Sequence, residues 1–183
     1  MKPVSKIIET FKGWADSFRQ DVEACKAIVE SNKADAESRR LAAAALSYLV
    51  TKLDLIPDHN EGIGIMDDIM VVRVLIQMAT QQHELGDLPS SAEVAIGRMT
   101  NEAERVNQLL GAPLYDKLKL YCAKLGDSKV RGRTPQMIVD DANLRKELYA
   151  EIEDELKRSV PVAVSDPAEA ELRLKSYLQH KLG

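Results

Sequence analysis

The sequence contains little cysteine, few aromatic residues and no long apolar run. Its 183 residues include two cysteines, Cys25 and Cys122, which are too few for a disulfide framework and indicate a reducing compartment. Aromatic residues make up 4% of the chain and the net charge is −4, so neither base stacking nor bulk positive charge favours a nucleic-acid partner. The first residues lack the continuous apolar segment of a signal peptide. We therefore expect a cytoplasmic protein that binds no nucleic acid.

Strand-like patterning is also absent. Val, Ile and Thr do not alternate with polar residues over any long stretch. Apolar residues instead recur at steps of three and four, which is the pattern of amphipathic helices. We predict an all-α fold, a bundle of about seven helices centred on a helical hairpin. The length suits one domain, residues 1–183. The alternative is a division into residues 1–86 and 87–183.

The N-terminal segment has the clearest helical pattern. Its apolar residues keep the three- and four-residue steps without a slip from Val4 to about Asn32, and they include the single tryptophan, Trp14. A face of this kind covers a core, docks on a partner or lies on a membrane surface. The opposite face mixes acidic and basic side chains instead of being mainly basic. We therefore expect a core-facing helix and no membrane-surface attachment.

An acidic run, residues 53–68, joins two apolar segments. It contains a proline and two glycines, which disfavour helix and permit unusual backbone angles. The preceding segment, from Leu41 to Leu53, has the spacing of a helix face, and the following one, from about Ile69 to Leu85, is apolar nearly all round. We predict that residues 41–85 form a hairpin of two core helices joined by an acidic loop.

This hairpin carries a recognisable order of residues. The order is Tyr48-Leu49-Val50, then Asp54-Leu55-Ile56-Pro57-Asp58, then Gly62-Ile63-Gly64 and Met66-Asp67-Asp68. It resembles the YkvA-like family, a domain of unknown function numbered 1232, over roughly residues 41–79. Lys52 stands where that family usually has a proline. The resemblance implies a bacterial protein with a helical hairpin and an ordered acidic loop, and it implies no activity.

Four carboxylates of the acidic run are candidate metal ligands. They are Asp54, Asp58, Asp67 and Asp68. Carboxylate oxygens suit hard divalent cations, but the run lacks the glycine and the final glutamate that an EF-hand loop requires. The alternative is a structural clasp, in which Asp67 or Asp68 caps the second helix of the hairpin.

Arg73 favours the structural alternative. A lone arginine in an apolar helix is rarely buried without a carboxylate or carbonyl partner. Asp67 and Asp68 precede it at a spacing that does not bring side chains of one helix together. We therefore expect Arg73 to pair with Asp54 or Asp58 across the hairpin.

Four further helices are predicted after the hairpin. Capping and breaking residues place them at about residues 90–110, 113–125, 135–156 and 167–182. Ser90 and Glu93 have the spacing of a capping box. A basic loop with Lys129, Arg131 and Arg133 leads into the third of these helices, and cationic side chains at a helix start suit a phosphate or another anion. The alternative is a solvated surface loop.

Nucleophilic catalysis has little support. His59, His83 and His180 are scattered, no serine has the flanking glycines of a nucleophile elbow, and no Walker-type phosphate loop is present. We expect a non-enzymatic interaction or regulatory module, without a cofactor, that binds a protein partner or a second copy of itself. One alternative is a divalent-metal-binding protein or metal-dependent hydrolase that uses the acidic loop. The other is a peripheral membrane protein that uses the N-terminal helix.

Overall fold

The computed structural model describes residues 6–51, 55–56, 63–81, 84–158 and 164–183. Over these ranges it contains helices and no strand, which confirms the all-α prediction. The helices are α1 (Lys6–Asp16), α2 (Phe18–Glu30), α3 (Ala36–Tyr48), α4 (Met66–Thr80), α5 (Ser90–Leu110), α6 (Ala112–Leu125), α7 (Pro135–Asp140), α8 (Ala142–Arg158) and α9 (Pro167–Leu182).

The described ranges contain nine helices instead of about seven, because two predicted helices are broken. Ser17, with φ −96° and ψ 2°, separates α1 from α2. Asp141, with φ −119° and ψ 110°, separates α7 from α8. The apolar pattern continues across both breaks, and this continuity made each pair look like one helix in the sequence.

Each break is accompanied by side-chain hydrogen bonds. Ser17 Oγ donates to Trp14 O at 3.2 Å and accepts from Arg98 Nη1 at 3.1 Å. Asp141 Oδ1 accepts from two N–H groups in the first turn of α8, at 2.8 and 3.2 Å. Serine and aspartate side chains of this kind compete with the hydrogen bonds of a continuous helix. Asp141 is therefore the N-cap of α8.

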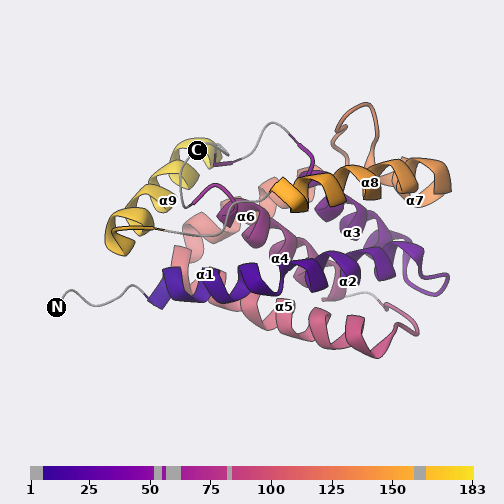
Figure 1. Ribbon diagram of the computed structural model, residues 1–183, viewed down its shortest axis with the longest axis horizontal. Coiled ribbons are helices and arrows are strands. Elements are labelled where there is room, and N and C mark those ends of the chain that lie inside the picture. Colours follow the sequence, from indigo (N-terminus) through magenta and orange to yellow (C-terminus); the bar gives the residue numbers. More distant parts are fainter. Residues whose placement is uncertain (1–5, 52–54, 57–62, 82–83, 159–163) are drawn as a thin grey trace.

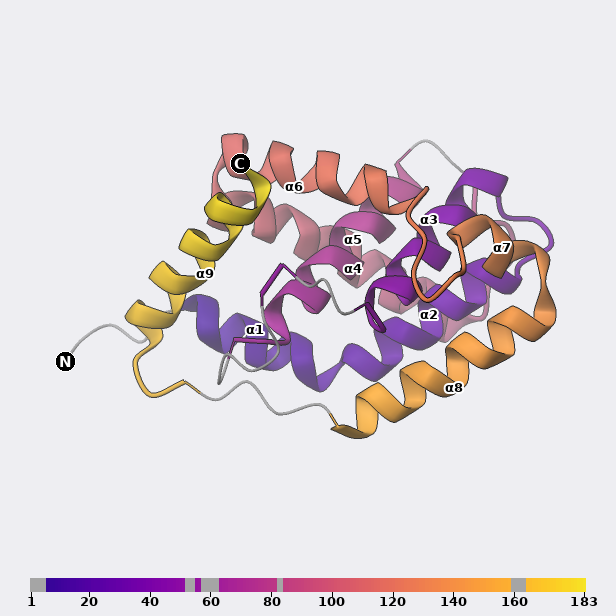
Figure 2. The same ribbon diagram turned by 90° about the horizontal axis from the view of Figure 1, so that it is seen from above.

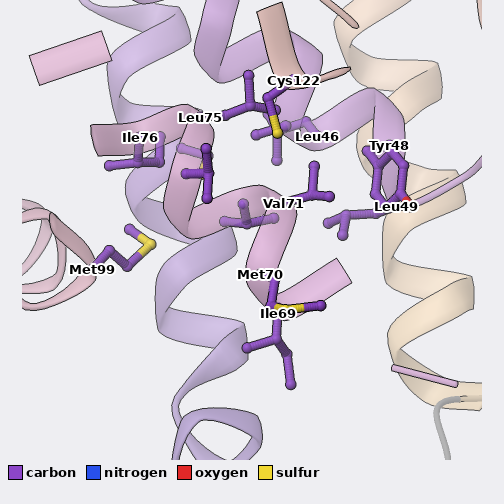
Figure 3. Packing of buried hydrophobic residues seen from close by; sticks show 14 of the residues in the cluster. Leu46, Tyr48, Leu49, Ile69, Met70, Val71, Leu75, Ile76, Met99 and Cys122 are labelled. Atoms are coloured by element: carbon purple, nitrogen blue, oxygen red, sulfur yellow. The ribbon is translucent and has the colours of Figure 1, made fainter. Parts of the chain in front are cut away.

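Helix α4 lies at the centre of the bundle. Helices α1, α2, α3, α5 and α6 all contact it, and Figures 1 and 2 show it enclosed among them. Its apolar side chains are buried on every side, as expected for a helix that is apolar nearly all round. Figure 3 shows Val71, Leu75 and Ile76 of α4 between Leu46 of α3 and Met99 of α5. The predicted central position of this helix is therefore observed.

The remaining helices cover the outside of this core. Helices α7 and α8 pack against α3, and α9 packs against α1 and α6. Each of these outer helices contributes side chains to the same hydrophobic cluster, namely Ile138 of α7, Leu148 of α8 and Leu174 of α9. Figure 2 shows α6 and α8 on opposite sides of the bundle.

Both hairpin helices are shorter than predicted. Helix α3 ends at Tyr48 instead of near Leu53, and the next three residues form tighter i→i−3 hydrogen bonds. Helix α4 begins at Met66 and ends at Thr80 instead of near Leu85. Its N-cap position belongs to Ile65, which provides no side-chain cap, and two aspartates lie within its first turn. Neither aspartate therefore occupies the N-cap position, although both lie in the turn where the helix dipole favours negative charge.

Other predicted helix starts can also be compared with the structure. Thr134 Oγ1 accepts from the N–H of Met137 at 3.2 Å and caps α7. Asp166 Oδ1 accepts from two N–H groups in the first turn of α9, at 3.1 and 3.2 Å. The predicted helix starts near residues 135 and 167 are therefore confirmed, each with a side-chain cap. The capping box predicted at Ser90 is wrong, because Pro89 takes the N-cap position and no side chain caps α5.

The apolar face of the N-terminal segment is buried. Ile8, Phe11 and Trp14 of α1 and Phe18 and Val22 of α2 all belong to the core. The described part of this face covers the core, as expected, and gives no support to a membrane-surface helix. Across the described ranges, none of the helices combines the length and the apolar character that crossing a bilayer requires.

Candidate functional site

The motif at residues 48–68, which resembles the YkvA-like family, places one tyrosine and one aspartate in direct contact. Tyr48, at the end of α3, donates its hydroxyl hydrogen to Asp67 Oδ2 in the first turn of α4, at 2.7 Å. The N–H of Leu55 donates to the Tyr48 hydroxyl at 3.0 Å, and the N–H of Ile56 donates to Asp67 Oδ2 at 3.4 Å. All four residues are buried. We call this arrangement the motif clasp, because it holds the two hairpin helices and residues 55–56 together.

The electrostatics of the clasp keep Tyr48 neutral. Burial, and then the neighbouring Asp67 carboxylate, raise the pKa of the Tyr48 hydroxyl far above its ordinary value. The hydroxyl therefore retains its proton and remains a donor to the carboxylate. Its ring also meets Tyr121 of α6 edge to face, with 6.4 Å between the ring centroids. The tyrosine thus combines packing with two hydrogen bonds, which is a structural role.

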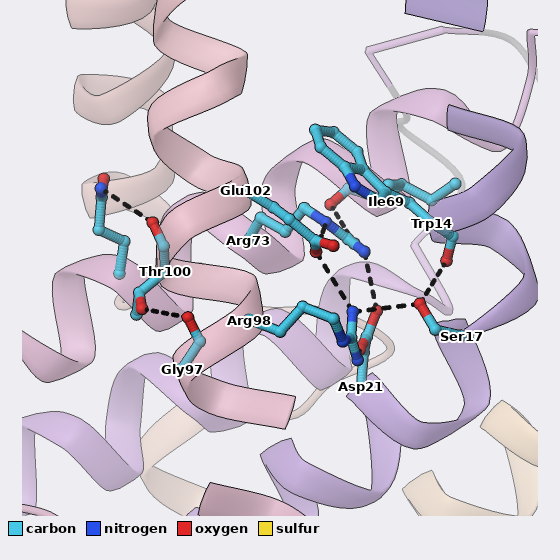
Figure 4. A network of polar contacts seen from close by, with 10 residues as sticks. Trp14, Ser17, Asp21, Ile69, Arg73, Gly97, Arg98, Thr100 and Glu102 are labelled. Atoms are coloured by element: carbon cyan, nitrogen blue, oxygen red, sulfur yellow. Dashed lines mark hydrogen bonds and ion pairs between the residues drawn. The ribbon is translucent and has the colours of Figure 1, made fainter. Parts of the chain in front are cut away.

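A second polar group lies inside the bundle, between α2, α4 and α5. Arg73 of α4 donates to Asp21 Oδ2 at 3.1 Å, to Glu102 Oε2 at 2.8 Å and to the carbonyl of Ile69 at 3.1 Å. Arg98 of α5 donates to Asp21 Oδ1 at 2.5 Å and to Glu102 Oε2 at 3.2 Å. Figure 4 shows these contacts. We call Asp21, Arg73, Arg98 and Glu102 the buried charge cluster.

The cluster balances two positive charges with two negative ones. Asp21 and Arg73 have fully buried side chains, whereas those of Arg98 and Glu102 are 29% and 12% exposed. Burial raises the pKa of Asp21, and the two guanidinium groups oppose that rise. Burial likewise lowers the pKa of Arg73. Charges buried this deeply are tolerated only when they are paired and hydrogen-bonded, so the four residues act as one unit.

Trp14 closes the cluster on the side of α1. The guanidinium carbon of Arg73 lies 4.7 Å from the centroid of the Trp14 ring, which is a cation–π contact. Phe11 meets the same tryptophan edge to face, at 5.2 Å between centroids. Figure 4 shows Trp14 over Arg73 and Ser17 beside Asp21. The junction between α1 and α2 therefore contacts the cluster directly.

Arg73 has two partners that the sequence-based expectation did not include. It bonds with Asp21 and Glu102, whereas Asp54 and Asp58, the partners expected across the hairpin, lie outside the described residues. The sequence contains a signal for both partners, because each acidic residue borders an apolar stripe. Asp21 lies among the inward residues of α2, and Glu102 lies between Met99 and Val106 of α5. A buried arginine and two inward carboxylates could have been matched from these patterns.

The four candidate metal ligands are only partly described. Asp54 and Asp58 lie outside the described residues. Asp67 takes part in the motif clasp, and Asp68 is half-buried in the first turn of α4. Within the described residues, no group of three or more His, Cys, Asp or Glu side chains is placed to hold a metal ion. The metal site therefore stays a prediction.

Two residues of the basic loop pair with α8. Arg131 contacts Glu151 at 3.1 Å, and the buried Arg133 contacts the same carboxylate at 2.5 Å. Arg131 has a positive φ of 50° in a two-residue turn, whose flanking residues Val130 and Arg133 exchange backbone hydrogen bonds. Lys129 is exposed. These ion pairs anchor the loop to α8, and the predicted anion site stays a prediction.

The candidate nucleophiles are not arranged for catalysis in the described part of the chain. Cys25 and Cys122 are both free and buried. Burial raises the pKa of each thiol well above its ordinary value, whereas a reactive cysteine requires a lowered pKa and solvent access. His180 is exposed on α9. His59 and His83 lie outside the described residues.

Comparison with known proteins gives one match. The family model described as "Protein of unknown function (DUF1232)" matches residues 38–73. This segment covers most of α3, the acidic loop and the first half of α4, and it includes the motif clasp and Arg73. The predicted resemblance is confirmed over this part of the chain. No curated protein and no solved structure matches the chain.

Proposed function

We propose that the protein is a non-enzymatic interaction or regulatory module, and that the family-matching segment builds its frame. The observation that carries this proposal is the bond between Tyr48 and Asp67. Asp67 of the motif is buried and accepts hydrogen bonds from Tyr48 and from the backbone of Ile56. A catalytic or metal-binding carboxylate would instead face a substrate or an ion. The motif therefore sets the geometry of the hairpin.

The buried charge cluster supports the same conclusion. Charged groups with shifted pKa values often mark active sites, but structural ion-pair networks shift pKa values as well. Here each guanidinium contacts both carboxylates, and Trp14 covers the cluster. Its charges are thus committed to joining α2, α4 and α5. The two free, buried thiols support a reducing compartment, and we propose the cytoplasm.

Thermal melting tests the metal-dependent alternative. A ligand that binds only the folded state raises the melting temperature by mass action. We expect chelator-treated protein to melt at the same temperature with and without millimolar Mg²⁺, Ca²⁺, Mn²⁺ or Zn²⁺. Asp68→Asn and Asp58→Asn are the diagnostic variants. A rise with one metal that either variant abolishes would support a metal site and contradict the proposal.

Crosslinking in the native host tests the interaction itself. We expect a defined crosslinked species, either with one protein partner or with a second copy of the chain. A reversible, membrane-permeable amine crosslinker is suitable, because the chain has exposed lysines, among them Lys33 between α2 and α3 and Lys117 on α6. A chain that remains uncrosslinked to any protein at its natural abundance would contradict an interaction role.

A further inference from the structure

Helix α4 lacks a polar face that would fix its orientation in the bundle. Its buried residues lie on every side of the helix, and Arg73 is the one charged residue of α4 beyond the first turn. Val72 and Val74, which flank Arg73, are equally buried. Turning α4 by one residue, about 100° around its axis, would place one of these valines where Arg73 lies. Apolar contacts alone therefore distinguish poorly between several orientations of this helix.

Polar contacts near both ends of α4 join it to α3. In the motif clasp, Tyr48 at the end of α3 donates to Asp67 in the first turn of α4. Near the other end, the buried Ser38 Oγ of α3 donates to the carbonyl of Ala79 at 2.9 Å. These bonds make the hairpin one unit, but they do not determine how α4 meets the helices on its other sides.

Arg73 lies on a different side of α4 from the motif clasp. It follows Asp67 by six residues, which places it about 120° away around the helix axis. Its guanidinium bonds with Asp21 of α2 at 3.1 Å and with Glu102 of α5 at 2.8 Å. Gln77 adds a longer bond, at 3.5 Å, to a carbonyl of α5. Another orientation of α4 would bury the guanidinium away from both carboxylates, and an unpaired buried charge is strongly unfavourable.

We propose that the buried charge cluster selects one orientation of α4 against α2 and α5, and that it adds little net stability to the fold. Replacing a buried ion pair by apolar side chains of similar volume is often neutral or stabilising, whereas removing one partner alone is costly. The cluster therefore raises the free energy of competing orientations more than it lowers that of the observed one. This role goes beyond the proposed function, because it concerns how the fold reaches a single packing.

A double variant that lacks the fully buried pair tests this role. Asp21→Val with Arg73→Met replaces the pair by apolar side chains of similar total size. Arg98 and Glu102 can still pair with each other within α5, as they do at 3.2 Å in the wild type. We expect the double variant to keep its helix content, measured by circular dichroism, and to unfold at a urea concentration at least equal to that of the wild type.

Methyl NMR then reports the orientation of α4. Figure 3 shows Val71, Leu75 and Ile76 between α3 and α5, so their neighbours differ between orientations. Each methyl group should give one set of signals in the wild type. The double variant should give several sets, broadened signals, or one set with changed contacts. The matched control, Arg19→Met with Glu153→Leu, removes an exposed ion pair between α2 and α8 and should keep the wild-type signals.

Two results would overturn the proposal. One set of methyl signals with the wild-type contacts in the double variant would show that apolar packing alone fixes α4. A double variant that is unfolded, or that unfolds at a lower urea concentration than the wild type, would show that the buried pair supplies stability instead of selecting an orientation. Either result leaves the proposed interaction function standing.

Discussion

Arg73 of α4 and Asp21 of α2 form a fully buried ion pair, with 3.1 Å between Nη2 and Oδ2. The pair joins the central helix to the N-terminal segment, although the two residues are far apart in the sequence. Glu102 and Arg98 of α5 complete it. Three helices are therefore held together inside the core by one set of charges that sums to zero.

Removing the arginine should destabilise the fold strongly. Arg73→Ala leaves Asp21 and Glu102 beside a single guanidinium in a buried site, and breaking a buried pair typically costs about 3–5 kcal/mol. Urea unfolding measures the change, and Arg105→Ala on the exposed face of α5 is the matched control. An unfolding free energy equal to that of the control would show that the cluster contributes little.

Asp21 should give stability a specific pH dependence. Burial raises its pKa in the folded state above the unfolded value, so the folded state holds this proton more tightly. Its contribution to stability is then present below the ordinary aspartate pKa and is lost as pH rises through the raised pKa. The stability of the wild type relative to Asp21→Asn should therefore fall as pH rises across this window.

Urea unfolding at a series of acidic to neutral pH values measures this difference. Glu104→Gln, on the exposed face of α5, controls for the loss of one surface carboxylate. A difference that grows with rising pH would show that the two guanidinium groups outweigh burial and lower the pKa of Asp21.

The two thiols should be inert in the folded protein. Cys25 and Cys122 are fully buried, and burial raises the pKa of both. A disulfide-exchange reagent at mildly alkaline pH should label neither thiol in native protein and both thiols in denaturant. Rapid labelling of either cysteine before unfolding would contradict the described packing.

Substitution by alanine should change the stability of the protein in opposite directions at two glycines. Gly86 has a φ of +71°, and a Cβ there would lie 2.4 Å from the Cβ of Lys33. Gly86→Ala should therefore lower stability by about 1–3 kcal/mol. Gly97 lies inside α5 with open space around it, so Gly97→Ala should raise stability by about 0.5–1 kcal/mol. Chemical denaturation measures the unfolding free energy of both variants. Changes of the same sign, relative to the wild type, would contradict this description.

The spacing of apolar residues predicted the architecture well, because the buried face of a helix repeats every three to four residues in the sequence. The central position of α4 followed from an apolar pattern on all its sides, and the helix starts near residues 135 and 167 followed from capping and breaking residues. The breaks at Ser17 and Asp141 were missed, because an apolar stripe does not record where one side chain interrupts the backbone hydrogen bonds.

The polar sites were less predictable because their partners are distant in the sequence. The requirement for a carboxylate near Arg73 was evident, but the choice of Asp21 and Glu102 depends on how α2 and α5 pack on α4. The motif was recognised from its residues, yet the bond between Tyr48 and Asp67 also needed the three-dimensional hairpin. Local patterns therefore identified Tyr48, Asp67 and Arg73, but not the contacts that these residues make.

A double-mutant cycle on Tyr48 and Asp67 tests the central claim most directly. Unfolding free energies of Tyr48→Phe, Asp67→Asn and the double variant give the coupling between the two side chains. If the motif clasp holds the hairpin together, the coupling should lie within about 0.5–3 kcal/mol, the range of residues in direct contact. If the changes in unfolding free energy of the two single variants add up to that of the double variant within about 0.3–0.5 kcal/mol, the two residues act independently. That result would contradict a structural role for the motif.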